Sequence, residues 1–303
     1  MMNSAQEGAA HDIPALLVAI RPRLHRYCAR MVGSAIDGED VLQDALIKAV
    51  EAASTAGPIR NPEGWLFRIA HNTALDFLRR RNRQEALHSL QEVDMIVDEI
   101  DTVASRQIAA TSLRTFMRLP VGQRASVILM DVLGCSLQEI CDVMDLSLPA
   151  VKAALHRGRT QLRELAEEPD DAPPPRLSAA DRTRLANYVD HFNARDFDGI
   201  RAMIAEDVKL DLVNRTRLTG KAEVSRYFGN YATINDWHLV PGLVEGHPAV
   251  LVLDPAAIPG SKPKYFILLG WASGKVARIR DFRHASYVAE DADILVDQDK
   301  IGR

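Results

Sequence analysis

The sequence predicts a multidomain protein with an all-α N-terminal half followed by an α+β domain. Three observations support this prediction. The chain has 303 residues, more than one compact core usually holds. Residues 167–177 include consecutive prolines, which interrupt helices and sheets and favour an extended linker. Before this linker apolar residues recur at helical spacing, and after it helices give way to alternating, strand-like segments.

The composition is that of a soluble globular protein, with 47% hydrophobic and 26% charged residues. No apolar run reaches the roughly 18 to 20 residues of a membrane span, so we expect a cytoplasmic protein without membrane contact. The three cysteines, Cys28, Cys135 and Cys141, show no CxxC spacing. We therefore predict no disulfide framework, no metal site and no cofactor.

Charge is segregated along the chain, although the net charge is only −4. Basic residues cluster at 79–83 and again at 152–163, whereas acidic residues concentrate at 92–101. Average charge therefore does not exclude a nucleic-acid partner, because local basic surfaces can bind phosphates.

Three helices are predicted before residue 85, at Ile13–Val32, Asp37–Ala53 and Pro62 to about Arg83. The third has an apolar stripe with a strongly basic end. Asn61 can cap it, and Pro62 suits its first turn. Residues 85–104 form an acidic linker, and helices resume near Ser105.

Residues 119–165 have the spacing of a helix-turn-helix. Helices are predicted at 121–133 and 136–144, followed by a turn at 145–147 and a helix at 148–165. Ser147 is a good N-cap and Pro149 lies in the first turn. Residues 151, 155, 158 and 162 form the packing face, and the opposite face is expected to present Lys152, Ala153, His156, Arg157 and Arg159. A basic exposed face and a free helix N-terminus favour DNA binding.

This stretch resembles region 4 of extracytoplasmic function (ECF) sigma factors of the sigma-70 family. The likeness lies in a Leu-Pro start, an Arg, Gly-x-Ser, Glu-Ile and a Val-Lys helix, here Leu119, Pro120, Arg124, Gly134, Ser136, Glu139, Ile140, Val151 and Lys152. Where the family usually has a glycine in the turn, this chain has Asp145, a residue type that tolerates a left-handed conformation. The resemblance implies that −35 promoter DNA is read by Ser147, Pro149, Lys152, Ala153, His156, Arg157 and Arg159.

A second stretch, DGEDVLQDALIKAV with NPEGWLFRIAHNTALDFLRRR, resembles region 2 of the same family. The likeness implies that Asp40, Gln43 and Asp44 bind core RNA polymerase. It also implies −10 DNA contacts from Asn72, Asp76, Arg79, Arg80 and Arg83. We interpret Trp65 as a core residue. The predicted domains are thus region 2 at 11–84 and region 4 at 105–166, and the implied partners are promoter DNA and the β′ clamp and β flap of the polymerase core.

Residues 178–303 are predicted to form the α+β domain. Helices at 178–194, 197–205 and 221–231 accompany strands at 208–213, 237–245, 249–253, 265–271 and 275–284. This order resembles the SnoaL-like cone, a curved antiparallel sheet wrapped by helices. Its candidate pocket residues are Asp211, Tyr227, Trp237, Tyr265 and Asp281. Local ion pairing with neighbouring arginines is the simpler explanation of Asp281, so no catalytic residue is predicted and a small-molecule ligand is left open.

The predicted function is that of an alternative sigma factor whose C-terminal domain modulates its activity. Two alternatives remain. One is a helix-turn-helix regulator that binds duplex DNA without polymerase, in which the residues at 40–44 have no role. The other is a SnoaL-like enzyme or ligand sensor fused to such a DNA-binding module, which predicts turnover that depends on Asp211 or Asp281.

Overall fold

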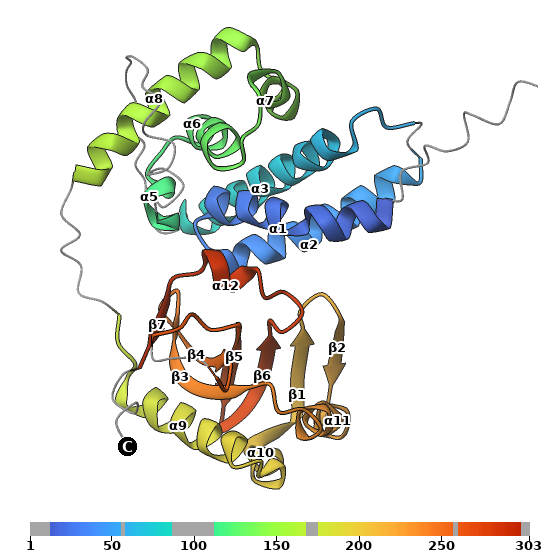
Figure 1. The fold of residues 1–303 in the computed structure, drawn as a ribbon, viewed down its shortest axis with the longest axis vertical. Coiled ribbons are helices and arrows are strands. Elements are labelled where there is room, and N and C mark those ends of the chain that lie inside the picture. Colours follow the sequence, from blue (N-terminus) through green and yellow to red (C-terminus); the bar gives the residue numbers. More distant parts are fainter. Residues whose placement is uncertain (1–12, 56–57, 87–111, 168–174, 257–259, 298–303) are drawn as a thin grey trace, which may run out of the picture. The chain divides into compact units, whose positions relative to one another are not determined.

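The computed structural model describes residues 13–55, 58–86, 112–167, 175–256 and 260–297. The chain divides into two compact units, 1–170 and 171–303, which are described separately below (Figure 1). The division falls inside the Pro-rich range 167–177. Most of the expected acidic linker at 85–104, and the expected return to helix near Ser105, lie outside the described residues.

Unit 1 begins with three helices, α1 (Ile13–Val32), α2 (Ala35–Ala53) and α3 (Pro62–Ala86). Gly33, at φ 80°, allows the sharp turn between α1 and α2. The Asn61 side chain accepts a hydrogen bond from the Gly64 N–H at 3.0 Å, which confirms the predicted cap of α3. These helices begin and end within a few residues of the predicted positions.

The second part of unit 1 contains α5 (Leu113–Met117), α6 (Val121–Val127), the π-helical turn η1 (Ile128–Val132), α7 (Leu137–Met144) and α8 (Leu148–Glu167). Ser136 and Glu139 form a reciprocal capping box at the start of α7. Asp145 ends α7 at φ 57°, the left-handed conformation expected from its position in the turn. The helix-turn-helix is therefore formed by α7 and α8.

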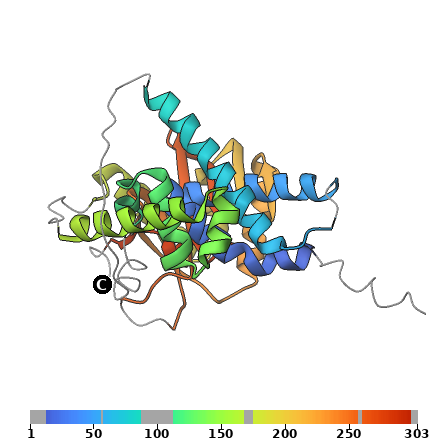
Figure 2. The ribbon, with the colours of Figure 1, turned by 90° about the horizontal axis from the view of Figure 1, so that it is seen from above.

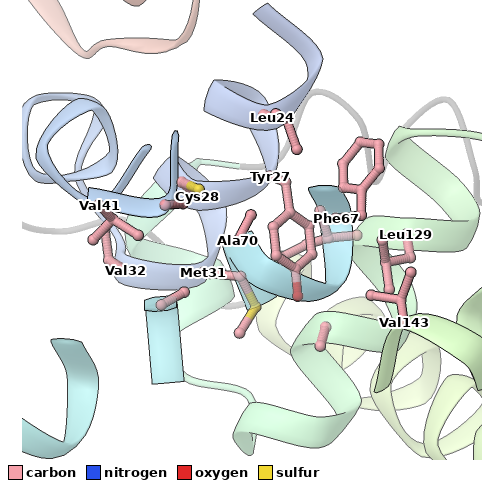
Figure 3. Packing of buried hydrophobic residues seen from close by; sticks show 14 of the residues in the cluster. Leu24, Tyr27, Cys28, Met31, Val32, Val41, Phe67, Ala70, Leu129 and Val143 are labelled. Atoms are coloured by element: carbon pink, nitrogen blue, oxygen red, sulfur yellow. The ribbon is translucent and has the colours of Figure 1, made fainter. Parts of the chain in front are cut away.

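Both groups of helices contribute to the hydrophobic core of unit 1. Leu24, Met31 and Phe67 from the first group are buried in the same cluster as Leu129 and Val143 from the second (Figure 3). Trp65 packs against this cluster, as predicted. Arg124 of α6 is buried and donates hydrogen bonds to three backbone carbonyls, those of Met31 on α1, Met117 at the end of α5 and Leu119 just after it. Burial lowers the Arg124 pKa to about 10, so its cation remains protonated at neutral pH.

Unit 2 opens with α9 (Ala179–Asn193) and α10 (Phe197–Met203) and continues into a seven-stranded sheet. The strands are β1 (Ile204–Leu212), β2 (Thr216–Thr219), β3 (His238–Val244), β4 (His247–Leu253), β5 (Tyr265–Ala272), β6 (Lys275–Asp281) and β7 (Ile294–Val296). Helix α11 (Lys221–Ala232) follows β2, and the short α12 (Val288–Asp291) precedes β7. The predicted α+β fold class is confirmed.

The sheet has the order β2-β1-β6-β5-β4-β3-β7 and is mixed rather than wholly antiparallel. Strands β3 to β6 form the expected antiparallel meander, but β1 runs parallel to β6, with Leu210 opposite Ile279. After β2, helix α11 leads to β3 on the far side of the sheet, and the meander from β3 to β6 then returns toward β1. Strand β6 therefore pairs with β1, the first strand of the domain. No helix among the described residues is long and apolar enough to cross a membrane.

Candidate nucleic-acid interface

The outer surface of α3 carries every residue that the sequence assigned to −10 DNA. The five side chains are all exposed, and their spacing places them on one helix face: Asn72, Asp76, Arg79, Arg80 and Arg83. Figure 2 shows the C-terminal end of α3, in cyan, projecting beyond the neighbouring helices of unit 1. We call this set the α3 surface.

The ion pairs on the α3 surface are loose. Arg79 lies 3.4 Å from Asp76, and Arg80 lies 3.9 Å from Asp44 of α2, with all of these side chains more than half exposed. Exposed pairs of this kind contribute about 0 to 1 kcal/mol because water screens them. The guanidinium groups are therefore held weakly and can exchange a carboxylate partner for a phosphate.

Next to the α3 surface, α2 presents the residues assigned to polymerase binding. Asp40 and Asp44 are exposed, while Gln43 is half-buried and donates a hydrogen bond to Glu39 at 3.2 Å. Two apolar side chains, Ile47 and Val50, are 58% and 56% exposed on the following turns. This α2 surface combines carboxylates with apolar area, a composition suited to a protein partner.

The first turns of α8 are open to solvent. Ser147, Pro149 and Lys152 are exposed, and Ala153 and Arg157 are half-buried. The opposite face packs inward, where a Cβ on Gly158 would approach the Val127 side chain to 2.7 Å. The close contact explains why this position takes glycine. The start of α8 is thus fixed by its inner face and free to contact a ligand on its outer face.

Two residues that the sequence placed on the exposed face of α8 lie elsewhere. His156 is only 8% exposed. Arg159 makes a bidentate contact with Asp131 of η1, at 2.5 and 2.9 Å, and the Asp131 side chain is 1% exposed. The expected exposure of these two residues was wrong, because helical spacing cannot show that a carboxylate 28 residues away lies beside the guanidinium.

In unit 2 a buried carboxylate occupies the end of β6. Asp281 is fully buried and accepts hydrogen bonds from the Tyr227 and Tyr231 hydroxyls, at 2.5 and 2.8 Å, and from the Arg283 backbone N–H at 2.8 Å. Burial raises the Asp281 pKa, and the three hydrogen bonds oppose that rise only in part. We call these residues, together with Tyr265, the Asp281 cluster.

Tyr265 extends the Asp281 cluster toward the surface. Its hydroxyl lies 3.2 Å from that of Tyr231 and accepts a hydrogen bond from the Arg283 guanidinium at 2.8 Å. Trp237 packs edge-on against Tyr231, with ring centroids 5.9 Å apart. The structure thus brings together four of the five predicted pocket residues. The structure also places Tyr231 in this cluster, a residue that the sequence prediction missed and that only its i, i+4 spacing from Tyr227 could have indicated.

The fifth predicted pocket residue, Asp211, lies on another face of the sheet. It pairs with Arg217 at 3.4 Å and Arg280 at 3.5 Å. The register places Asp211 opposite Arg280 and Leu212 opposite Asp281, so the two carboxylates point to opposite sides. Asp211 and Asp281 therefore do not share a pocket.

The expected ion pairing of Asp281 with neighbouring arginines is also corrected. The Arg280 side chain turns to Asp211, and the Arg283 guanidinium lies 3.2 Å from Asp236. Phenol hydroxyls and a backbone amide hold the Asp281 carboxylate instead. In the part of the chain that the structure describes, no group of three or more His, Cys, Asp or Glu side chains is placed to hold a metal ion.

Family models match both parts of unit 1: sigma-70 region 2 at residues 16–84 and sigma-70 region 4 at residues 113–162. The ECF RNA polymerase sigma factor SigM of Mycobacterium tuberculosis is 31% identical over 143 residues, which cover 47% of this chain and 71% of SigM. The chain belongs to the ECF sigma factors. SigE of Mycolicibacterium smegmatis, another ECF sigma factor, is 32% identical over 146 residues, and the match spans 47% of this chain and 56% of SigE.

A match to the ECF RNA polymerase sigma factor SigG of Mycobacterium tuberculosis is longer, with 30% identity over 228 residues that cover 65% of this chain and 60% of SigG. Unit 2 is similar in fold to a putative polyketide cyclase from Pseudomonas putida, with 20% identity and a TM-score of 0.27 over 37% of this chain and 98% of the cyclase. The sigma-factor resemblance is confirmed by the family match, while the roles of individual residues stay predictions.

Proposed function

We propose that this chain is an alternative sigma factor that directs core RNA polymerase to promoters. In this function α2 binds the polymerase β′ clamp, α3 holds the opened −10 element, and α8 reads the −35 element. The observation that supports it best is the α3 surface, where all five predicted −10 residues are exposed beside the α2 surface. A helix-turn-helix with an accessible recognition helix lies in the same unit.

The charges of the α3 surface suit a single strand. Three guanidinium groups, those of Arg79, Arg80 and Arg83, follow Asn72 and Asp76 along one helix face. Cations bind the phosphates, and the amide and carboxylate can form hydrogen bonds with unstacked bases. A stand-alone duplex-binding regulator needs neither this surface nor the acidic and apolar side chains of α2.

For unit 2 we propose a regulatory role without catalysis. The Asp281 carboxylate already has three donors and is fully buried, an arrangement that stabilises the fold without a substrate. Asp211, the other carboxylate named in the enzyme alternative, is paired with Arg217 and Arg280. Unit 2 therefore acts by modulating the polymerase or promoter binding of unit 1.

The test is transcription in vitro with purified core polymerase and promoter DNA selected from a genomic library. The full chain is compared with a chain cut at residues 173–176, between the two units. Transcripts from either form support the sigma-factor function, and the difference between them gives the sign of the control by unit 2. Silence from both forms, with duplex binding that does not need polymerase, would favour the stand-alone regulator.

An Arg80→Glu variant tests the α3 surface directly. Charge reversal should reduce open-complex formation at least about tenfold, because it removes one phosphate contact and adds repulsion. Arg114→Glu is the matched control, since Arg114 is exposed on α5, away from α3. Equal activity of both variants would refute the −10 assignment.

A further inference from the structure

The outer surface at the start of α8 is mostly carbon. Leu148 is 41% exposed and Leu146 is 39% exposed, and Pro149 and Ala150 are exposed beside them. Within residues 146–153 only Lys152 carries a charge, and only Ser147 has a hydroxyl. These four neighbouring side chains form a small apolar patch, and exposed apolar patches mark interaction sites.

The chemistry of the major groove limits what this segment can read. Adenine is read by Asn or Gln, cytosine by Asp or Glu, guanine by Arg or Lys, and the C5-methyl group of thymine by apolar side chains. Residues 146–153 contain no Asn, Gln, Asp, Glu or Arg. Thymine is therefore the base that the leucine side chains of this segment match.

Leu148 has the better position of the two leucines. It opens α8 one turn before both the buried Val151 and the exposed Lys152, so its side chain lies at the border between the inner and outer faces, where it is 41% exposed beside Lys152. The inner face is occupied by Val151 and Leu155, which are buried. Leu146 precedes the helix, and its backbone N–H is tied to the Cys141 carbonyl at 3.2 Å, so it lies in the turn rather than on that face.

We propose that Leu148 is a specificity-determining residue that contacts the C5-methyl group of a thymine in the −35 element, with Lys152 bound to a neighbouring phosphate or guanine. This inference rests on the proposed function, in which α8 enters the major groove of the −35 duplex. Burying one methyl group changes affinity by about fourfold. Leu148 therefore sets a preference for thymine at one position without supplying most of the binding.

The experiment replaces thymine by deoxyuridine, which lacks only the methyl group. Holoenzyme assembled from core polymerase and the full chain is bound to its selected promoter, with each −35 thymine on either strand replaced in turn. The expected result is a loss of about fourfold at one or two positions and no change elsewhere. Transcription with no effect of any replacement would overturn the inference and leave the proposed function standing, whereas the absence of binding to every promoter would count against the proposed function.

Variants then assign the effect to the side chain. Leu148→Ala should bind the thymine and deoxyuridine promoters equally at the sensitive position, while Leu148→Met should keep the difference. Val121→Ala is the control, because Val121 is also 41% exposed but lies at the start of α6. If the thymine preference persists in Leu148→Ala, and amide hydrogen exchange shows that α8 is still folded, the assignment is overturned.

Discussion

Each unit contains a buried aspartate, and the two carboxylates are stabilised in different ways. Asp131 in unit 1 faces the Arg159 guanidinium through two hydrogen bonds, so a full positive charge lies against it. Asp281 in unit 2 faces two neutral phenols and a backbone amide. The first site is an ion pair with little net charge, whereas at the second no cation touches the buried carboxylate directly and its pKa is raised by burial.

The difference predicts how each unit responds to change. A buried ion pair is sensitive to the loss of one partner, because the remaining charge is left uncompensated. A carboxylate held by neutral donors is sensitive to pH, since burial favours its protonated form and raises its pKa. The two sites are therefore expected to lose stability under different conditions.

The largest expected effect is that of Arg159→Ala, which leaves Asp131 buried without its cation. We expect the free energy of unfolding of unit 1 to fall by about 3 to 5 kcal/mol. Amide hydrogen exchange of the full chain measures this loss separately in α6, α8 and the sheet of unit 2. The double variant Asp131→Ala/Arg159→Ala should recover part of the loss, and a double variant as unstable as the sum of the single ones would show that the pair is not coupled.

Tyr227→Phe should have the next largest effect, because it removes one of the three donors to Asp281. A hydrogen bond to a charged group contributes about 1.5 to 3 kcal/mol, so unit 2 should lose stability in that range. This loss of stability is measured by denaturant unfolding, monitored through hydrogen exchange of the amides in β5 and β6. In an Asp281→Asn background the same change should cost less, and an equal cost in both backgrounds would contradict a charge-assisted hydrogen bond.

A smaller effect is expected from pH. The Asp281 pKa is raised in the folded chain above the unfolded value of about 3.9, because burial disfavours the anion. Its contribution to stability is therefore fully present below about pH 3.9 and is lost as the pH rises through the folded pKa. The difference in unfolding free energy between the native chain and Asp281→Asn should decline over that window, and a difference that does not change with pH would refute the raised pKa.

The same comparison shows what the sequence could predict. Helix bounds in unit 1 were accessible because caps and turns are local, as Asn61, Ser136 and Asp145 illustrate. The burial of Arg159 could not be predicted from the sequence, because its partner Asp131 is 28 residues away on a π-helical turn that no local pattern marks. Likewise, the split between Asp211 and Asp281 follows from a parallel β1–β6 register that links strands far apart in the chain.

The smallest expected effect on stability is that of Lys152→Glu, on the same helix as Arg159. Lys152 is exposed on the outer face of α8, so the free energy of unfolding should change by no more than about 0.5 kcal/mol. Binding of holoenzyme to the −35 duplex should nevertheless weaken about tenfold, and the slope of log affinity against log salt should fall by about one because one phosphate contact is lost. Footprinting across a salt series compares Lys152→Glu with Arg159→Ala, using equal concentrations of folded protein. This comparison separates a loss of DNA contact at Lys152 from a loss of folding at Arg159. If Lys152→Glu leaves both the footprint and the salt slope unchanged, the outer face of α8 does not contact DNA, and the division of this helix into an inner structural face and an outer DNA-reading face is wrong.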